Sequence, residues 1–257
     1  MADEVLTERD GAVLTITLNR PEVYNAFNRD LHAALAAALA QAAEQEVRAV
    51  VITGAGRGFC AGQDLHEFRQ ISGTIGERLE ETYHPNIHAI RSLEKPVVAA
   101  ANGPAAGAGL SLACACDVRI ASDAATFVPG FIGIGLVPDS GGSLFVYRIL
   151  GERAFEWMVS NRRLSAQEAL AWRLVSEIVP ADGFEAHVRE LAASYAALPT
   201  RGVGLTKRLF DGAATAGSLD EQLALEAELQ QEATQSEDFR EGLQAFLDKR
   251  PPEFRGR

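Results

Sequence analysis

The sequence is constrained most by a stretch of small residues, 99–113 (AAANGPAAGAGLSLA), which joins an apolar segment typical of a strand to an apolar segment typical of a helix. At the start of a helix the first backbone N–H groups have no partner within the helix, so they can point at a bound group. Few side chains in this stretch carry functional groups. A site made of backbone amides suits an oxyanion, and we expect the acid or base to come from elsewhere in the chain.

Two further glycine-rich segments stand beside predicted strands or helices. Residues 54–65 follow a buried strand predicted at 47–53, and residues 133–142 precede a helical run at 143–150. Repeated strand, strand, helix units favour a mixed α/β core. We expect the three glycine-rich turns to converge on one face of that core.

The remaining pattern predicts the order of the elements. A β-hairpin opens the chain around Asp10-Gly11, and an alanine-rich helix is expected at 28–46. The polar, irregular segment 68–84 is typical of a mobile loop. From these patterns we expect a core at residues 1–198 and a C-terminal helical region at 199–257. Further strands are expected at 5–8, 13–18, 97–101, 117–121, 126–128 and 175–179, and helices at 87–93, 169–172 and from 184 onward.

Charge and cysteine content exclude several classes of protein. The 257 residues carry a formal net charge of −11 with a pI near 5.0, which argues against nucleic-acid or anionic-membrane binding. The N-terminus lacks a secretory pattern and no apolar run is long enough to span a bilayer, so we expect a cytoplasmic protein. Cys60, Cys114 and Cys116 form neither a disulfide framework nor a zinc pattern, and are expected to be reduced, packed thiols.

Two other kinds of site are considered and disfavoured. The segment 52–58 contains the G-x-G of a dinucleotide-binding turn, but Phe59 replaces a glycine of the full pattern and no Tyr-x-x-x-Lys pair occurs. His84 and His88 have the spacing of two metal ligands on one helix face, but no third ligand is evident. No metal site is therefore predicted.

Asp139 is the candidate acid or base, and two interpretations of it remain open. It lies after a proline and before Ser140-Gly141-Gly142, where its carboxylate could cap the following helix. Alternatively Ser140 supplies the cap. In that case the apolar run 132–137 surrounds the Asp139 carboxyl and raises its pKa toward a value useful for proton transfer.

Taken together, the motifs resemble the crotonase family, also called the enoyl-CoA hydratase/isomerase superfamily. The resemblance covers essentially the whole chain and implies a spiral core of ββα units with a C-terminal helical oligomerisation region. It also implies an acyl-CoA thioester substrate, no further cofactor, and a homotrimer or a dimer of trimers. The matching motifs are Asn19-Arg20-Pro21 with Asn25-Ala26, the segment 59–65, Lys95-Pro96, the segment 102–113, Cys116-Asp117, the segment 135–139 and the segment 245–250.

The resemblance also implies roles for individual residues. The N–H groups of Ala61 and Ala108 would form the oxyanion hole for the thioester carbonyl. Phe246 and Lys249 would complete a CoA pocket, often across a subunit boundary. The residues implied to line the channel for the CoA portion are Ala26, Ala61, Gly62, Gln63, Asp64 and Leu65.

One departure from the family pattern shifts the expected reaction. Hydratases of the family carry two glutamates that activate water, and the matching positions here are Ser111 and Gly130. A single Asp139 suits a proton shift. In the segment 136–142 (LVPDSGG) and in the helical tail 241–254, the chain resembles the branch that isomerises ring-1,2-epoxyphenylacetyl-CoA to oxepin-CoA and shifts double bonds from 3-enoyl-CoA to 2-enoyl-CoA. The alternatives are a hydratase of fatty-acid β-oxidation that recruits a carboxylate from 77–81, and a non-catalytic acyl-CoA-binding or RNA-binding relative.

Overall fold

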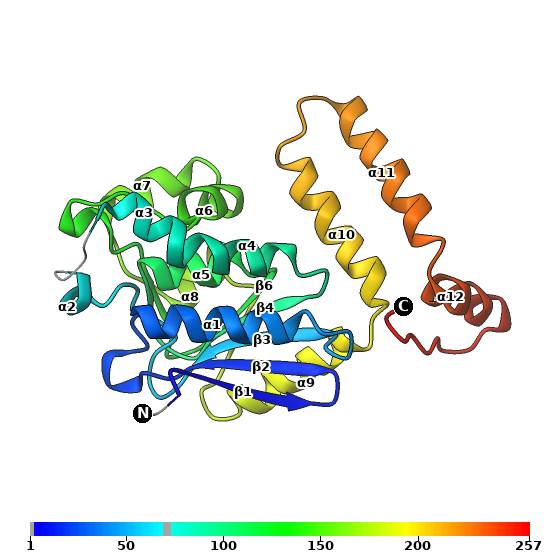
Figure 1. Cartoon of the computed structure of the whole chain (residues 1–257), viewed down its shortest axis with the longest axis horizontal. Helices are drawn as coiled ribbons and strands as arrows, with labels where there is room; N and C mark the ends of the chain where they lie inside the picture. The colour runs from blue at the N-terminus through cyan, green and yellow to red at the C-terminus, as the bar shows by residue number, and fades with distance from the viewer. Residues whose placement is uncertain (1–2, 69–72) are drawn as a thin grey trace.

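A six-stranded sheet runs through the core of the computed structural model, which describes residues 3–68 and 73–257 (Figure 1). The strand order is β1-β2-β3-β4-β6-β9, and only the β1–β2 pair is antiparallel. Gly11, with φ +57°, makes the hairpin turn predicted from the sequence. The bounds are β1 Val5–Asp10, β2 Val13–Leu18, β3 Ala49–Gly54, β4 Val97–Ala101, β6 Val118–Ser122 and β9 Glu177–Val179.

A second, three-stranded sheet stands beside the first and holds the helix that carries the small-residue stretch. It consists of β5 (Ala105–Ala106), β7 (Thr126–Val128) and β8 (Leu164–Ser165). A single parallel bridge joins Cys60 to Ala105. Because β5 leads directly into the following helix, the turn at 54–65 and the start of that helix lie together.

Alternate residues of the parallel strands face the two layers of the core, as the two-residue period of a strand requires. On β3, Val50 and Ile52 pack in the larger core cluster, while Val51 packs in the smaller cluster with Phe184 and Val188. The smaller cluster is covered by α9, and the larger one by α1, α4 and α5. Their bounds are α1 Arg29–Ala42, α4 His84–Ser92, α5 Ala108–Ala115 and α9 Phe184–Ala196.

The segment predicted to be a loop at 68–84 is largely helical, so that prediction is wrong for residues 75–84. Thr74 and Glu77 form a reciprocal capping box that starts α3 (Ile75–Arg78). The chain then continues through a π-helical turn, η2 (Leu79–Tyr83), directly into α4. Residues 69–72 lie outside the described residues.

Short helices connect the layers around the sheets. The alanine-rich helix α1 ends at Ala42, four residues before the predicted end at 46. The remaining elements of the core are η1 Pro21–Val23, α2 Leu65–Phe68, η3 Ile132–Ile134, α6 Gly142–Leu150, α7 Arg153–Ser160 and α8 Ala166–Ala171.

Three C-terminal helices extend to one side of the sheet (Figure 1). They are α10 (Thr200–Ala213), α11 (Leu219–Ala233) and α12 (Glu237–Asp248). Charged groups hold α10 to the core: Lys207 Nζ lies 2.9 Å from Asp117 Oδ2, and Arg91 donates to both oxygens of Asp211 at 2.8 and 2.9 Å. No helix in residues 3–68 or 73–257 is both long and apolar enough to cross a membrane.

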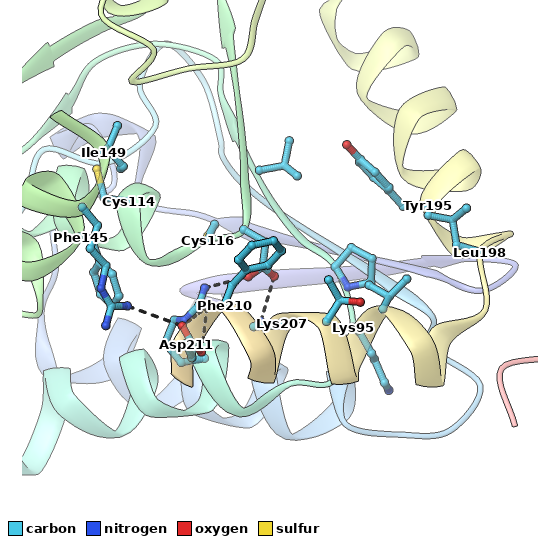
Figure 2. Close-up of a pocket in the computed structure, with 17 residues that line it drawn as sticks. Lys95, Cys114, Cys116, Phe145, Ile149, Tyr195, Leu198, Lys207, Phe210 and Asp211 are labelled. Carbon is cyan, nitrogen blue, oxygen red and sulfur yellow. Dashed lines mark hydrogen bonds and ion pairs between the residues drawn. The ribbon is translucent and has the colours of Figure 1, made fainter. Parts of the chain in front are cut away.

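A cavity of about 440 Å³ lies between α10 and the core, and Figure 2 shows Lys207, Phe210 and Asp211 reaching it from α10. Asp117, which lies in this cavity, directly precedes β6. It is half-buried, and its carboxylate accepts from the Val97 N–H at 2.9 Å as well as from Lys207. The ion pairs of this cavity therefore connect the C-terminal helices to the start of β6. None of the predicted site residues lines it.

Candidate active site

A second cavity, of about 260 Å³, gathers the residues that the sequence placed at a site. The predicted residues that line it are Ala61, Gln63, Leu65, Ala108 and Asp139. Its other walls come from the helical segment 75–83 and from residues 130–137. The further lining residues are Phe68, Ile75, Arg78, Leu79, Tyr83, Ala106, Gly107, Gly130, Phe131, Ile134, Leu136 and Val137. The expected convergence of the three glycine-rich turns is therefore confirmed, on a mostly apolar chamber.

Backbone hydrogen bonds decide which amides at the 54–65 turn remain free. The Ala61 N–H donates to the Tyr24 carbonyl oxygen at 2.9 Å, so it is already engaged. A bridge to Phe27 uses the Gly62 carbonyl and the Asp64 N–H, at 2.7 and 2.9 Å, and leaves the Gln63 N–H out of the pairing. Within the described chain, Gln63 N–H has no acceptor. Gln63, which lines the cavity, therefore carries an unpaired amide two residues beyond the predicted donor.

The Gln63 turn and the start of α5 approach each other closely. Gly62 has φ +85°, and a Cβ added there would lie 2.7 Å from the Ala106 oxygen and 3.2 Å from the Ala108 nitrogen. The Ala108 N–H belongs to the first turn of α5, where helical N–H groups have no partner within the helix. Two unpaired amides therefore stand at one wall of the cavity. Fixed donors of this kind suit a developing negative charge on oxygen.

The Asp139 carboxyl lies in the cavity and does not cap α6. The N-cap of α6 is Gly141, and no N–H of the described backbone donates to the Asp139 carboxylate. The interpretation of Asp139 as a helix cap is therefore wrong, and so is the alternative that Ser140 supplies the cap, because no side chain caps α6. Burial raises the pKa of the Asp139 carboxyl above its usual value, while a 3.0 Å hydrogen bond from Ser140 and the nearby His84 act in the opposite direction. Among the described lining residues it is the only carboxyl group.

The two positions implied to hold glutamates in hydratases have other roles here. Ser111 is 1% exposed, and its hydroxyl donates to the Asp139 carbonyl oxygen at 3.0 Å. Ser111 is thus a packed serine within α5. Gly130 has φ +80°, lines the cavity, and donates its N–H to Asn161 Oδ1 at 2.7 Å. Neither position supplies a group that could transfer a proton.

Several residues predicted to contact the CoA portion lie outside the cavity lining. Ala26 is buried, and its carbonyl accepts from Arg20 at 2.6 Å. Asp64 pairs with Arg20 at 3.1 Å and accepts from the His66 N–H at 3.0 Å. Phe246 is 80% exposed on α12, at the opposite end of the molecule from α2 and α3 (Figure 1). Lys249 follows directly as the C-cap of α12. Within one chain, neither Phe246 nor Lys249 reaches the cavity.

The turn at 54–58, the possible metal ligands and the cysteines, considered above from the sequence, can be located in the structure. The turn at 54–58 closes around the buried Asn25 side chain, which donates to the carbonyls of Ala55 and Gly58 at 3.0 and 2.8 Å. No group of three or more His, Cys, Asp and Glu side chains suited to a metal occurs in the described part of the chain. The three cysteines are free and buried, as expected. Burial raises the pKa of the Cys60 thiol to about 12, which disfavours a reactive thiolate there.

Sequence reasoning missed Tyr83, because it assigned 68–84 to a loop. The Tyr83 ring is 6% exposed and lines the cavity, and its hydroxyl donates to Gln63 Oε1. The capping-box spacing of Thr74 and Glu77 was the signal that could have revealed a helix there.

Comparison with known proteins finds relatives that match nearly the whole chain. The profile of the enoyl-CoA hydratase/isomerase family matches residues 8–257. The chain is 41% identical to the 1,2-epoxyphenylacetyl-CoA isomerase of Escherichia coli, over all of both chains, and 47% identical to a probable enoyl-CoA hydratase of Rhodobacter capsulatus, over 94% of each. The crystal structure of an enoyl-CoA hydratase from Bacillus anthracis superposes with a TM-score of 0.93 at 32% identity, covering 99% of this chain and all of that one. The fold class expected from the crotonase resemblance is confirmed.

Proposed function

This chain belongs to the enoyl-CoA hydratase/isomerase family, and on that premise we propose that it is an acyl-CoA isomerase in which Asp139 moves a proton. The observation that carries the proposal is the single carboxyl group in a cavity that also holds two unpaired amides. Hydration by the two-glutamate route needs two carboxylates, and Ser111 and Gly130 stand at those positions. A 1,3-proton shift returns the proton that it takes, so one carboxylate suffices.

The amides of Gln63 and Ala108 would bind the thioester oxygen in this mechanism. Negative charge develops on that oxygen when a proton leaves the α or γ carbon, and a fixed donor contributes about 3 kcal/mol where measured by removal. Gln63 replaces Ala61 as the proposed donor, because the Ala61 N–H is bonded to Tyr24. Ala108 keeps its expected role.

Asp139 would act as base and then as acid. Its carboxylate takes the proton from one carbon, and the resulting carboxylic acid returns it to the other carbon. Burial raises the pKa of Asp139, which brings its two protonation states closer in free energy near neutral pH. The same group could assist opening of a ring epoxide, which is also an isomerisation and adds no atoms.

The proposed substrates are 1,2-epoxyphenylacetyl-CoA, giving oxepin-CoA, and 3-enoyl-CoA, giving 2-enoyl-CoA. The name of the Escherichia coli relative supports the first. Apolar side chains such as Leu79, Phe131 and Leu136 dominate the cavity wall and suit a ring or an alkenyl group. No cofactor besides the CoA of the substrate is proposed.

An enoyl-CoA hydratase is the second candidate, and the Rhodobacter capsulatus relative favours it. It would need another carboxylate, for which the sequence offered residues 77–81. Glu77 instead accepts from the Thr74 N–H at 2.8 Å, and neither it nor the exposed Glu81 lines the cavity. The geometry therefore favours isomerisation over hydration. The remaining alternative, a relative that binds acyl-CoA without catalysis, would be excluded by turnover of any CoA ester.

We propose that Phe246 and Lys249 serve the site of a second copy of the chain, in a homotrimer or a dimer of trimers. Large apolar side chains are exposed on all three C-terminal helices, which supports burial against other copies. Examples are Phe210, Leu219 and Phe246, exposed by 73%, 72% and 80%. Light scattering coupled to size-exclusion chromatography tests this assembly, and a monomeric mass at micromolar concentration would contradict it.

Product analysis tests the proposed reaction. The protein is incubated with a panel of 2-enoyl-, 3-enoyl- and epoxyphenylacetyl-CoA esters, and products are separated by chromatography and identified by mass. Isomerisation leaves the mass of the substrate unchanged, whereas hydration adds one water. Formation of 3-hydroxyacyl-CoA as the main product would contradict the isomerase assignment.

A further inference from the structure

Tyr83 belongs to a cluster of aromatic rings at the wall of the cavity. Its ring contacts Phe27 edge-on, with the centroids 5.5 Å apart, and His32 at 4.0 Å. His32 is buried, and burial lowers its pKa to about 3, so the imidazole is neutral. The cluster thus offers no charge near the Tyr83 ring, and contacts with Phe27 and His32 hold the ring in place.

The Tyr83 hydroxyl has one partner among the described residues, the Gln63 carboxamide oxygen. Burial and the neighbouring Asp139 raise the pKa of Tyr83, so the hydroxyl keeps its proton and donates it. The other end of the same carboxamide, Nε2, donates to the carbonyl oxygens of Phe27 and Asp64, at 3.1 Å each. The Gln63 side chain is therefore held at both ends.

Holding this side chain constrains the peptide that precedes it. The Gln63 N–H is the proposed donor at the 54–65 turn, and it belongs to the same peptide as the Gly62 carbonyl, which accepts from the Phe27 N–H at 2.7 Å. That bond fixes the carbonyl end of the peptide, and the Gln63 side chain anchors the residue that carries the N–H. A π-helical turn, a feature frequent at functional sites, places Tyr83 at the point where it meets Gln63. Small displacements of a positioned group can lower a rate by about 10²-fold.

We propose that Tyr83 is a positioning residue for this oxyanion site. Its hydroxyl, acting through the Gln63 carboxamide, directs the Gln63 backbone N–H toward the thioester oxygen. The inference rests on the proposed function, because it assumes that a thioester oxygen occupies the space between Gln63 and Ala108. It assigns Tyr83 no proton transfer.

Tyr83→Phe keeps the ring and removes only the hydroxyl. We expect kcat for 3-enoyl-CoA isomerisation to fall about 10-fold with little change in KM, since the donor is misdirected in the transition state more than in the substrate complex. Tyr195→Phe is the matched control: Tyr195 lies on α9, lines the other cavity (Figure 2), and its hydroxyl has no partner in the described chain. Unchanged kcat in Tyr83→Phe would overturn the proposal.

A double-mutant cycle with Gln63→Met tests whether the two side chains act as one unit. Methionine has a similar length but cannot accept the Tyr83 hydroxyl. We expect the double variant to be no slower than Gln63→Met alone. Independent, multiplicative losses would overturn the proposal, and Gln63→Met alone supplies the test should Tyr83→Phe fold poorly.

The carbonyl stretch of bound phenylacetyl-CoA, labelled with ¹³C at the thioester carbon, separates this inference from the proposed function. This ester is a saturated thioester that binds without needing turnover. We expect binding to the wild-type protein to lower the stretching frequency, and Tyr83→Phe to show a smaller shift. Equal frequency shifts in the two proteins would overturn only the role proposed for Tyr83. If the wild-type protein shows no shift, the two-amide site is overturned, and this inference with it.

Discussion

The Ser111 hydroxyl on α5 donates to the backbone carbonyl oxygen of Asp139 at 3.0 Å. This bond ties the helix that begins with the Ala108 N–H to the loop that carries the carboxyl group. Gly142 packs over the same bond, because a Cβ added there would lie 2.3 Å from Ser111 Oγ. The position that resembles a hydratase glutamate thus helps to hold the loop of Asp139, the proposed acid or base, in place.

Gly142→Ala should break this arrangement. The added methyl group forces the Ser111 hydroxyl away from the Asp139 carbonyl, and overpacking of this kind costs about 1–3 kcal/mol. We expect a lower midpoint of thermal unfolding and a several-fold lower kcat. Gly202→Ala in α10 is the control, since its Cβ would have no neighbour closer than 3.7 Å. In the Ser111→Ala background, Gly142→Ala should lower the unfolding midpoint and kcat by less than it does in the wild type. If the effects of the two substitutions simply add, the steric explanation is contradicted.

Asp139→Asn should abolish most of the isomerase activity. Removal of a general acid or base lowers a rate by about 10²- to 10⁴-fold. Binding of phenylacetyl-CoA, measured by calorimetry, should change little, because the amides that hold the thioester remain. Full retention of 3-enoyl-CoA isomerisation in this variant would exclude Asp139 as the group that moves the proton.

The raised pKa of Asp139 predicts opposite effects of pH on rate and on stability. As a base, Asp139 must be ionised, so kcat/KM should fall as pH drops through its raised pKa. Burial penalises the charged form of Asp139, so its pKa is higher in the folded than in the unfolded protein. The free energy of unfolding therefore decreases as the pH rises from the ordinary carboxyl pKa through the raised one. Asp139→Asn should therefore unfold at a higher temperature than the wild type near neutral pH, with the difference shrinking in acid. A constant difference at all pH values would contradict this assignment.

Gly62→Ala should separate the two turns that carry the unpaired amides. Its Cβ would lie 2.7 Å from the Ala106 oxygen, at a φ of +85° that alanine adopts poorly. Gly183→Ala is the matched control, because Gly183 has φ +99° but no atom within 4 Å of an added Cβ. We expect Gly62→Ala to lose far more isomerase activity than Gly183→Ala. Equal activities would mean that backbone strain, not the approach of the turns, limits the site.

Lys249→Asn tests the proposed contribution of the C-terminal helices to CoA binding. Lys249 has φ +58°, a conformation that asparagine tolerates, so the substitution removes the charge without new strain. We expect a several-fold higher KM, an unchanged kcat and a weaker dependence of KM on salt. Arg173→Asn is the control, because the exposed Arg173 has a similar φ of +62°. Equal KM values for the two variants would argue against a role for Lys249.

Much of the fold and part of the site follow from local sequence. The hairpin around Gly11, the alternation of Val50, Val51 and Ile52, and the small residues of 99–113 act within a few positions of the chain, so periodicity and turn chemistry suffice to predict them. The absence of a carboxylate at Ser111 and Gly130 is likewise visible in the sequence. These features pointed to Asp139 and to backbone amides as the chemical groups of the site.

Only the tertiary structure decided which amides are free and which side chain positions them. The Ala61 N–H is occupied because the sheet order brings the Tyr24 carbonyl to it, and Gln63 is left unpaired by the bridge to Phe27. Tyr83 reaches Gln63 because the π-helical turn at 79–83 packs against α1, an arrangement that the local sequence did not indicate. Each of these outcomes depends on partners distant along the chain, and hydrogen-bond pairing between distant segments is set by packing and not by local propensity.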